Sequence, residues 1–145
     1  MHEFNLNAIE VALEPFVVTQ DSEGLGAAID SAGCSGITFV INIGESLDTL
    51  SGSVYHTFTI QKAIDSAFTS PVDCSASELS NASGTLSAAT IVVDDPAEDG
   101  VVHILHVTPD ADYRYYRLED DVTGTHTNGT PIGAIAIKHF ETSVS

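Results

Sequence analysis

The chain has 145 residues, with 21 Asp and Glu against four Lys and Arg, and a formal net charge of -17. That length predicts one domain, and folding would hide about two-thirds of the surface that the unfolded chain exposes. So few cations cannot neutralise many phosphates, and so many carboxylates are repelled by an anionic membrane, so we expect neither nucleic acid nor membrane as a partner. No apolar run is long enough to span a bilayer, and the N-terminus lacks a basic, apolar leader, which predicts a soluble chain without a secretory address.

The acidic composition indicates the salt concentration in which the protein works. Carboxylates crowded on a small domain repel one another in dilute buffer and oppose compaction. In molar salt the screening length falls to roughly 3 Å, and most of that repulsion disappears. The composition therefore favours a halophilic or marine protein, with an ordinary acidic protein as the alternative.

The chain predicts many short strands and little helix, because brief apolar runs alternate with segments rich in Gly, Ser and Thr. The expected strands, about eight, lie in chain order at residues 16–19, 27–30, 37–44, 54–61, 89–94, 101–107, 115–122 and 132–140. Two packed sheets bury strands this apolar and limit free edges. We therefore predict an all-β, single-domain β-sandwich of the jelly-roll kind over residues 15–145, preceded by an N-terminal arm or short helix at residues 1–14.

Side-chain alternation assigns faces to several of these strands. In the strand at residues 54–61, His56 shares a face with Phe58 and Ile60. The last strand, 132–140, is apolar on both faces, which predicts a position inside the sandwich.

Two connections are less clear. Residues 62–68 fit either two helical turns or a structured loop. Residues 70–85 contain Pro71 and many Ser residues, and they are expected to form a long connection, a kind of segment that often carries function.

The segment 110–122 holds three of the four tyrosines and two of the four Lys and Arg residues. Alternation places Tyr116 and Leu118 on one face of its strand and Arg117 on the other. Arginines beside acidic neighbours can form bidentate, charge-assisted hydrogen bonds that lysine cannot match. We therefore expect Arg114, Tyr116 and Arg117 to have structural roles, with solvated arginines on an ordinary strand as the alternative.

Residues with reactive side chains form no recognisable catalytic or metal-binding motif. His103 and His106 are three apart, which on a strand points them to opposite faces, so they cannot chelate one metal together. The acidic clusters at 94–99, 110–112 and 119–121 match no calcium-loop pattern, and solvated carboxylates are favoured over a cation site. No Gly-x-Ser-x-Gly elbow is present. We expect no enzymatic activity and no cofactor.

The two cysteines, Cys34 and Cys74, match no metal-ligand spacing. They could form one disulfide if the protein works outside a cell. Small buried hydrophobes are the favoured interpretation.

Four segments follow one another in a distinctive order, at residues 36–44, 55–61, 116–118 and 131–137. In this order, over roughly residues 15–140, the chain resembles small structural proteins that are encoded with the head genes of tailed viruses and that decorate or cement the capsid. The resemblance is one of pattern and carries no catalytic motif. It implies a β-sandwich that sits on a lattice of major capsid protein, commonly as a homo-oligomer at symmetry axes.

What the resemblance implies is a non-enzymatic virion protein on the capsid exterior, with the major capsid protein and further copies of itself, as a trimer or pentamer, as partners. Many copies would make weak individual contacts effective. The arm 1–14 and the connection 70–85 are the candidate contact segments. The alternatives are a neck, tail or fibre component of a virion, and a free ligand- or carbohydrate-binding jelly-roll module.

Overall fold

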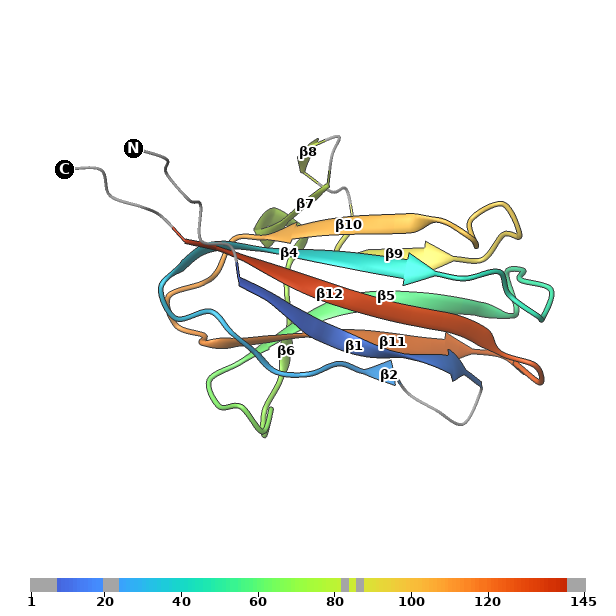
Figure 1. The fold of residues 1–145 in the computed structure, drawn as a ribbon, viewed down its shortest axis with the longest axis horizontal. Helices are drawn as coiled ribbons and strands as arrows, with labels where there is room; N and C mark the ends of the chain where they lie inside the picture. The colour runs from blue at the N-terminus through green and yellow to red at the C-terminus, as the bar shows by residue number, and fades with distance from the viewer. Residues whose placement is uncertain (1–7, 20–23, 82–83, 86–87, 141–145) are drawn as a thin grey trace.

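A computed structural model describes residues 8–19, 24–81, 84–85 and 88–140. Over these residues the chain is all-β: two antiparallel sheets pack face to face, and the sole helical element described is a short 3₁₀ turn, η1 (Ala76–Glu78) (Figure 1). The predicted single-domain β-sandwich is confirmed.

Sheet A contains six strands. In spatial order they are β1 (Ala8–Val18), β12 (Thr130–Phe140), β4 (Cys34–Ile43), β10 (Val102–Val107), β7 (Leu79–Asn81) and β8 (Gly84–Thr85). The first four are long and lie side by side, and they form most of one layer (Figure 1).

Sheet B forms the second layer. Its main path runs through β2 (Gly24–Leu25), β11 (Tyr115–Thr123), β5 (Tyr55–Ala63) and β6 (Val72–Asp73). Two more short strands join it: β3 (Ile29–Asp30) pairs with β11, and β9 (Thr90–Val93) pairs with β5.

The pairing is nested along the chain. β1 pairs with β12, β2 and β3 pair with β11, β4 pairs with β10, and β5 pairs with β9. A chain doubled over in this way and rolled into two sheets is a jelly roll. Its eight positions agree with the predicted number of strands, since β2 and β3 share one position and β6, β7 and β8 are short additions.

The core between the sheets is aliphatic and aromatic. Phe39 and Ile41 of β4 face Phe58 and Ile60 of β5 and their neighbours, and all four are fully buried. Burying a side chain of this size stabilises the fold by roughly 1.5–3 kcal/mol. The prediction that His56, Phe58 and Ile60 share one face is confirmed, and that face points inward, since His56 is also fully buried.

The predicted N-terminal arm is wrong in its described part. Residues 8–14 belong to β1, which pairs with β12 along the edge of sheet A. Two register shifts, between Val11 and Leu13 and between Leu13 and Phe16, break the alternation. Because a bulge inserts a residue and inverts the pattern of faces, the strand reads as apolar at mixed spacing. Residues 1–7 lie outside the described residues.

The two ambiguous connections are both resolved. After β5 ends, the backbone N–H groups of Ala67 and Thr69 donate to Oδ1 of Asp65, at 3.0 and 3.3 Å, so this segment is a structured loop without helical turns. The connection 70–85 is more ordered than a plain loop, since it contains β6, η1, β7 and β8.

The last strand is only half inside the sandwich. β12 lies between β1 and β4, with Ile132 and Ala136 buried on its inner face, but Ile135 on its outer face is 38 % exposed. The prediction of an interior strand is therefore right about its neighbours in the sheet and wrong about its outer face, which is open to solvent.

Candidate functional site

The outer face of sheet A is aliphatic across four strands. Val11 of β1, Ile135 of β12, Val40 of β4 and Ile104 of β10 oppose one another in register and form one row across the sheet. Val11 is 52 % exposed and Ile104 39 %. Cross-strand neighbours of this kind have adjacent side chains, so the row is continuous.

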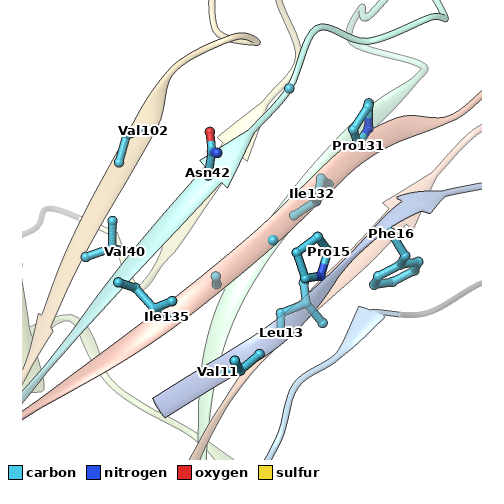
Figure 2. Close-up of a pocket in the computed structure, with 13 residues that line it drawn as sticks. Val11, Leu13, Pro15, Phe16, Val40, Asn42, Val102, Pro131, Ile132 and Ile135 are labelled. Carbon is cyan, nitrogen blue, oxygen red and sulfur yellow. The ribbon is translucent and has the colours of Figure 1, made fainter. Parts of the chain in front are cut away.

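More aliphatic side chains flank this row. Ile9 opposes Ile137 on one side, and Val102 opposes Asn42 on the other. Figure 2 shows Val11, Val40, Val102 and Ile135 gathered over the four neighbouring strands. We call this surface the aliphatic face, and it comprises Ile9, Val11, Val40, Val102, Ile104, Ile135 and Ile137.

A groove of about 670 Å³ runs along the aliphatic face and ends near Pro15, Phe16 and Pro131. The bulged part of β1 lies close over β12 at this point, because Gly133 has no side chain there. A Cβ at Gly133 would lie 3.1 Å from Cγ of Pro15. None of the residues that line the groove is charged.

Charge is also scarce in the strands beneath. The four long strands of sheet A contain just Glu10, Glu14 and Lys138 as charged residues. Lys138 Nζ pairs with Glu10 Oε1 at 2.9 Å. Both residues occupy strand positions between the outward residues of the aliphatic face, so their side chains belong to the other side of the sheet. Glu14 borders a separate groove beside Leu25. In a chain of net charge -17, this side of the sandwich is the neutral one.

One polar cluster continues the face. Thr38 of β4 opposes His106 of β10, and its Oγ1 lies 2.7 Å from His106 Nδ1 and 2.7 Å from His139 Nε2. His139 of β12 opposes Gly36, whose missing side chain leaves it free to lean toward Thr38. A single hydroxyl can donate to one imidazole and accept from the other, so Thr38 serves both rings while both are neutral.

The outer face of sheet B differs in kind. On β11, the side chains of Arg117, Glu119 and Asp121 point outward, away from the core. Arg117 Nε donates to Oε1 of Gln61 at 2.9 Å, and its guanidinium lies 4.4 Å from the centre of the Phe68 ring. This face is polar and charged.

A chain of polar groups is buried between the sheets. His56 Nδ1 lies 2.9 Å from Asp120 Oδ2, its Nε2 lies 3.0 Å from Thr130 Oγ1, and that hydroxyl lies 2.9 Å from Ser46 Oγ. Hydroxyl, imidazole and carboxylate stand in the order of a Ser/His/Asp triad. However, His56, Asp120 and Thr130 are all 0 % exposed, so no substrate can reach them. This row of hydrogen-bonded side chains connects sheet B to sheet A.

These hydrogen-bonded side chains lie in an apolar environment. Burial raises the pKa of Asp120, and the hydrogen bond from His56 opposes that shift without cancelling it. The His126 ring meets the His56 ring edge-on, 4.6 Å between centroids, and its Nε2 bonds the Thr123 carbonyl at 3.0 Å. The other nitrogen of His126 is buried and has no hydrogen-bond partner among the residues that the structure describes.

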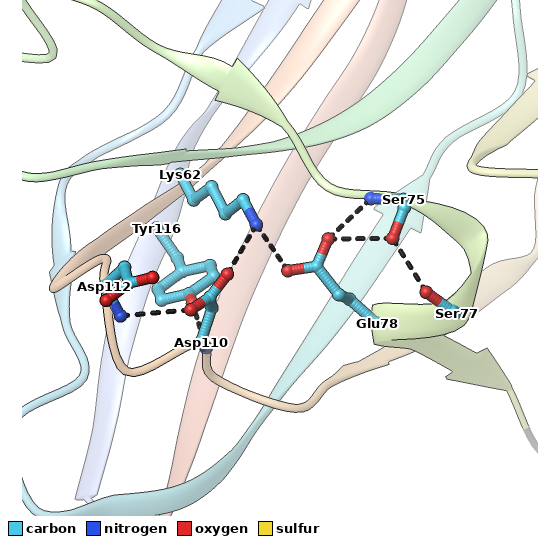
Figure 3. A network of polar contacts seen from close by, with 7 residues as sticks. All are labelled: Lys62, Ser75, Ser77, Glu78, Asp110, Asp112 and Tyr116. Carbon is cyan, nitrogen blue, oxygen red and sulfur yellow. Dashed lines mark hydrogen bonds and ion pairs between the residues drawn. The ribbon is translucent and has the colours of Figure 1, made fainter.

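A second polar network lies at the opposite end of β5. Lys62 Nζ, on a buried side chain, pairs with Oε1 of Glu78 and, at 3.0 Å, with Oδ2 of Asp110 (Figure 3). The hydroxyl of Tyr116 accepts a hydrogen bond from the backbone N–H of Asp110 at 2.7 Å. Burial acts to lower the pKa of Lys62, but the two carboxylates outweigh burial and raise it. Both carboxylates that pair with Lys62 also accept backbone hydrogen bonds, Glu78 from Ser75 and Asp110 from Asp112, which suits a structural network.

The residues predicted to be structural lie in three different contacts. Arg114 makes a bidentate pair with Asp30, Nε to Oδ1 at 3.0 Å and Nη2 to Oδ2 at 2.8 Å. Asp30 is far from Arg114 in sequence and belongs to β3, so sequence neighbours could not reveal it. Tyr116 is fully buried, and Arg117 bonds Gln61 and not a carboxylate among the contacts described.

Both cysteines are free thiols. Cys74 is 1 % exposed, and burial raises its pKa to about 12. Cys34 is half-buried. The prediction of a small buried hydrophobe therefore holds for Cys74 and only in part for Cys34.

The aliphatic face is not predicted from the sequence as a contact surface. A signal is present, since residues 132–140 are apolar on both faces. That pattern predicts burial on both sides, whereas one side is exposed.

In the part of the chain that the structure describes, no group of three or more His, Cys, Asp or Glu could hold a metal ion. Nor does that part contain a helix long and apolar enough to cross a membrane. Comparisons with protein-family models, with curated proteins and with solved structures found no match for this chain.

Proposed function

We propose that this chain is a non-enzymatic structural protein of a virion, which decorates and stabilises the capsid by binding across neighbouring subunits of the major capsid protein. The observation that carries the proposal is the aliphatic face. In a chain of net charge -17, one side of the sandwich exposes branched aliphatic side chains around a groove without charge.

Such a face favours contact with another protein. Soluble monomers rarely expose contiguous apolar patches larger than a few hundred Å². Covering apolar surface stabilises a complex by roughly 25 cal/mol per Å², before the losses of freedom on association. Ile9, Val11 and Val102 are each more than half exposed and would lose the most water. The strands that carry them are already hydrogen-bonded, so little ordering is needed on binding.

The difference in charge between the two outer faces of the sandwich also suits a particle surface. With sheet A against the capsid, the charged outer face of sheet B points to solvent, where Arg117, Glu119 and Asp121 lie. A charged outer surface keeps particles from associating. Weak binding by each copy is sufficient, because many copies bind and each lattice position provides several contacts.

High salt suits this mode of binding. Screening in molar salt reduces repulsion between this acidic chain and an acidic partner. Salting-out ions strengthen the burial of apolar surface at the same time. We therefore expect decoration to persist in molar salt.

The direct test is to purify particles of the source virus and to look for the chain in them by mass spectrometry. Released chain is then rebound to stripped particles, as wild type and as Val11→Asp. Val11→Asp places a carboxylate inside the contact, and we expect it to weaken binding about 10- to 100-fold.

The matched control is Val92→Asp. Val92 is 42 % exposed on β9 in sheet B and undergoes the same change on the opposite layer. It should bind like wild type. Absence of the chain from purified particles, or equal losses in the two variants, would contradict the proposal. Recovery with tails in place of heads would favour the neck, tail or fibre alternative.

A further inference from the structure

The histidine cluster forms part of the proposed contact surface. Thr38 opposes Ile137, which opposes Ile9, so the cluster continues a row of the aliphatic face. His106 is exposed and His139 is half-buried. A partner that covers this row therefore also covers the cluster.

The cluster is bonded without charge in one protonation state only. With neutral rings, the Thr38 hydroxyl serves both imidazoles, at 2.7 Å each. With protonated rings, both nitrogens are donors toward the same oxygen, and the hydroxyl proton must turn elsewhere. Two positive charges then stand on either side of one side chain.

Nothing described beside the cluster would neutralise those charges. His106 is flanked by β4 and β7, and His139 by β4 and β1. The other titratable groups of these strands, of β10 and of β12 are Cys34, Glu10, Glu14, His103 and Lys138. His103 alternates to the inner face of β10, and Glu14 lies beside Leu25, where β1 pairs with the part of β12 far from His139. Glu10 is already paired with Lys138, and burial raises the pKa of the Cys34 thiol, which keeps it neutral.

We propose that docking of the aliphatic face is linked to protons: the chain binds its partner while the His106–Thr38–His139 cluster is neutral and releases it when the imidazoles are protonated. The inference rests on the proposed function for the identity of the surface and adds its regulation. Covering an unpaired charge is costly, whereas covering a bonded neutral cluster is not. Because linkage is reciprocal, a partner that excludes protons is itself excluded by them.

Histidine is the side chain that ordinarily changes charge between pH 5 and 8. For an ordinary imidazole, one proton that must be lost on binding lowers the affinity about 10-fold at about one pH unit below its pKa. Two such protons lower the affinity up to about 100-fold. Attachment near neutral pH and release in mild acid are the expected behaviour.

A partner-free test uses retention on phenyl-agarose in molar ammonium sulfate, at about pH 8 and about pH 5.5. The proteins are wild type, the double variant His106→Gln/His139→Gln, and the control His103→Gln. His103 lies on the same strand but alternates to the other face. Far-UV circular dichroism and urea unfolding establish that each variant is folded.

The retention of each protein at the higher pH serves as its own reference. At the lower pH, wild type and His103→Gln should lose more of that retention than the double variant, because only the double variant keeps the face uncharged. Protonation of carboxylates elsewhere affects all three equally. Equal loss of retention by wild type and the double variant in acid would overturn the inference.

Rebinding to stripped particles of the source virus separates the two proposals. We expect wild type to lose up to about 100-fold in affinity between the two pH values and the double variant to change less than about 3-fold. Binding that is equally strong at both pH values overturns the proton linkage and leaves the proposed function standing. Absence of binding at either pH contradicts the proposed function, and the resin result still decides whether protons gate the face.

Discussion

The two sheets differ in where they carry charge. The long strands of sheet A have one ion pair, Glu10–Lys138, and an outer face without charge in its groove. Sheet B carries charged side chains on both sides: Asp121 points outward, whereas Lys62 and Asp120 are buried. The aliphatic face therefore lies on the outer side of sheet A, whereas the buried polar networks lie between the sheets, mostly on sheet B, with Thr130 of β12 joining one of them from sheet A.

The buried groups of sheet B have a consequence for its register. A slip of one residue between β5 and β11 would turn His56 or Asp120 toward solvent and break their hydrogen bonds. We expect these pairs to specify the alignment of sheet B. Sheet A relies on apolar packing and backbone hydrogen bonds for the same purpose.

The largest expected effect is at Asp120. Asp120→Ala leaves the buried His56 without its carboxylate, and we expect the free energy of unfolding to fall by about 3–5 kcal/mol in urea titrations. Asp120→Asn should cost less, since an amide oxygen can still accept from His56 Nδ1. The neighbouring outward residue provides the control, because Asp121→Ala should change stability by about 0.5 kcal/mol or less. Similar losses at both positions would contradict the contrast between the buried and the outward side of sheet B.

Smaller losses of stability are expected when either lysine that forms an ion pair is replaced. Lys62→Met removes the cation between Glu78 and Asp110, and we expect a loss of about 1–3 kcal/mol in the free energy of unfolding. Lys138→Met breaks the pair with Glu10, which is 41 % exposed, so the loss should stay below about 1 kcal/mol. Urea titration of both variants measures the difference. A larger loss at Lys138 would reverse the comparison.

The smallest effect concerns an exposed pair and depends on pH. The hydrogen bond from Arg114, followed by that from the backbone of Ala32, lowers the pKa of Asp30 to about 2. Because the folded pKa lies below the unfolded one, the stabilisation is present above about pH 4 and is lost as the pH falls toward 2. Asp30→Asn should therefore be slightly less stable than wild type at neutral pH and equal to it near pH 2. Urea unfolding across this range tests the convergence, and a difference that persists in acid would refute it.

Much of the fold could be predicted because the relevant signals are local. Alternation with period two predicts that His56, Phe58 and Ile60 share one face, as they do in the core, and turn-rich segments mark the ends of strands. The bulges in β1 hid that alternation, so residues 8–14 were interpreted as an arm. A bulge is visible only once the partner strand is known.

The polar contacts could not be predicted in the same way. Asp120 has the same parity as Leu118, but within Glu119-Asp120-Asp121 it resembles a solvated carboxylate. Its burial depends on pairing with β5, which brings His56 beside it from a distant part of the chain. The aliphatic face was missed for a related reason: a strand apolar on both sides has the same pattern whether its outer side is covered or exposed.

The pairing of β1 with β12 joins the two ends of the described chain. β12 is the last strand of the described residues, so until it has been synthesised the edges of β1 and β4 that pair with it have no neighbour. Closing distant segments is entropically slow, and the nested order lets the β5–β9 pair form across a shorter span first. We expect refolding over milliseconds to seconds, with protection of β12 amides appearing last in pulse-labelling hydrogen exchange. Early protection of β12 would show that the roll closes from its ends inward.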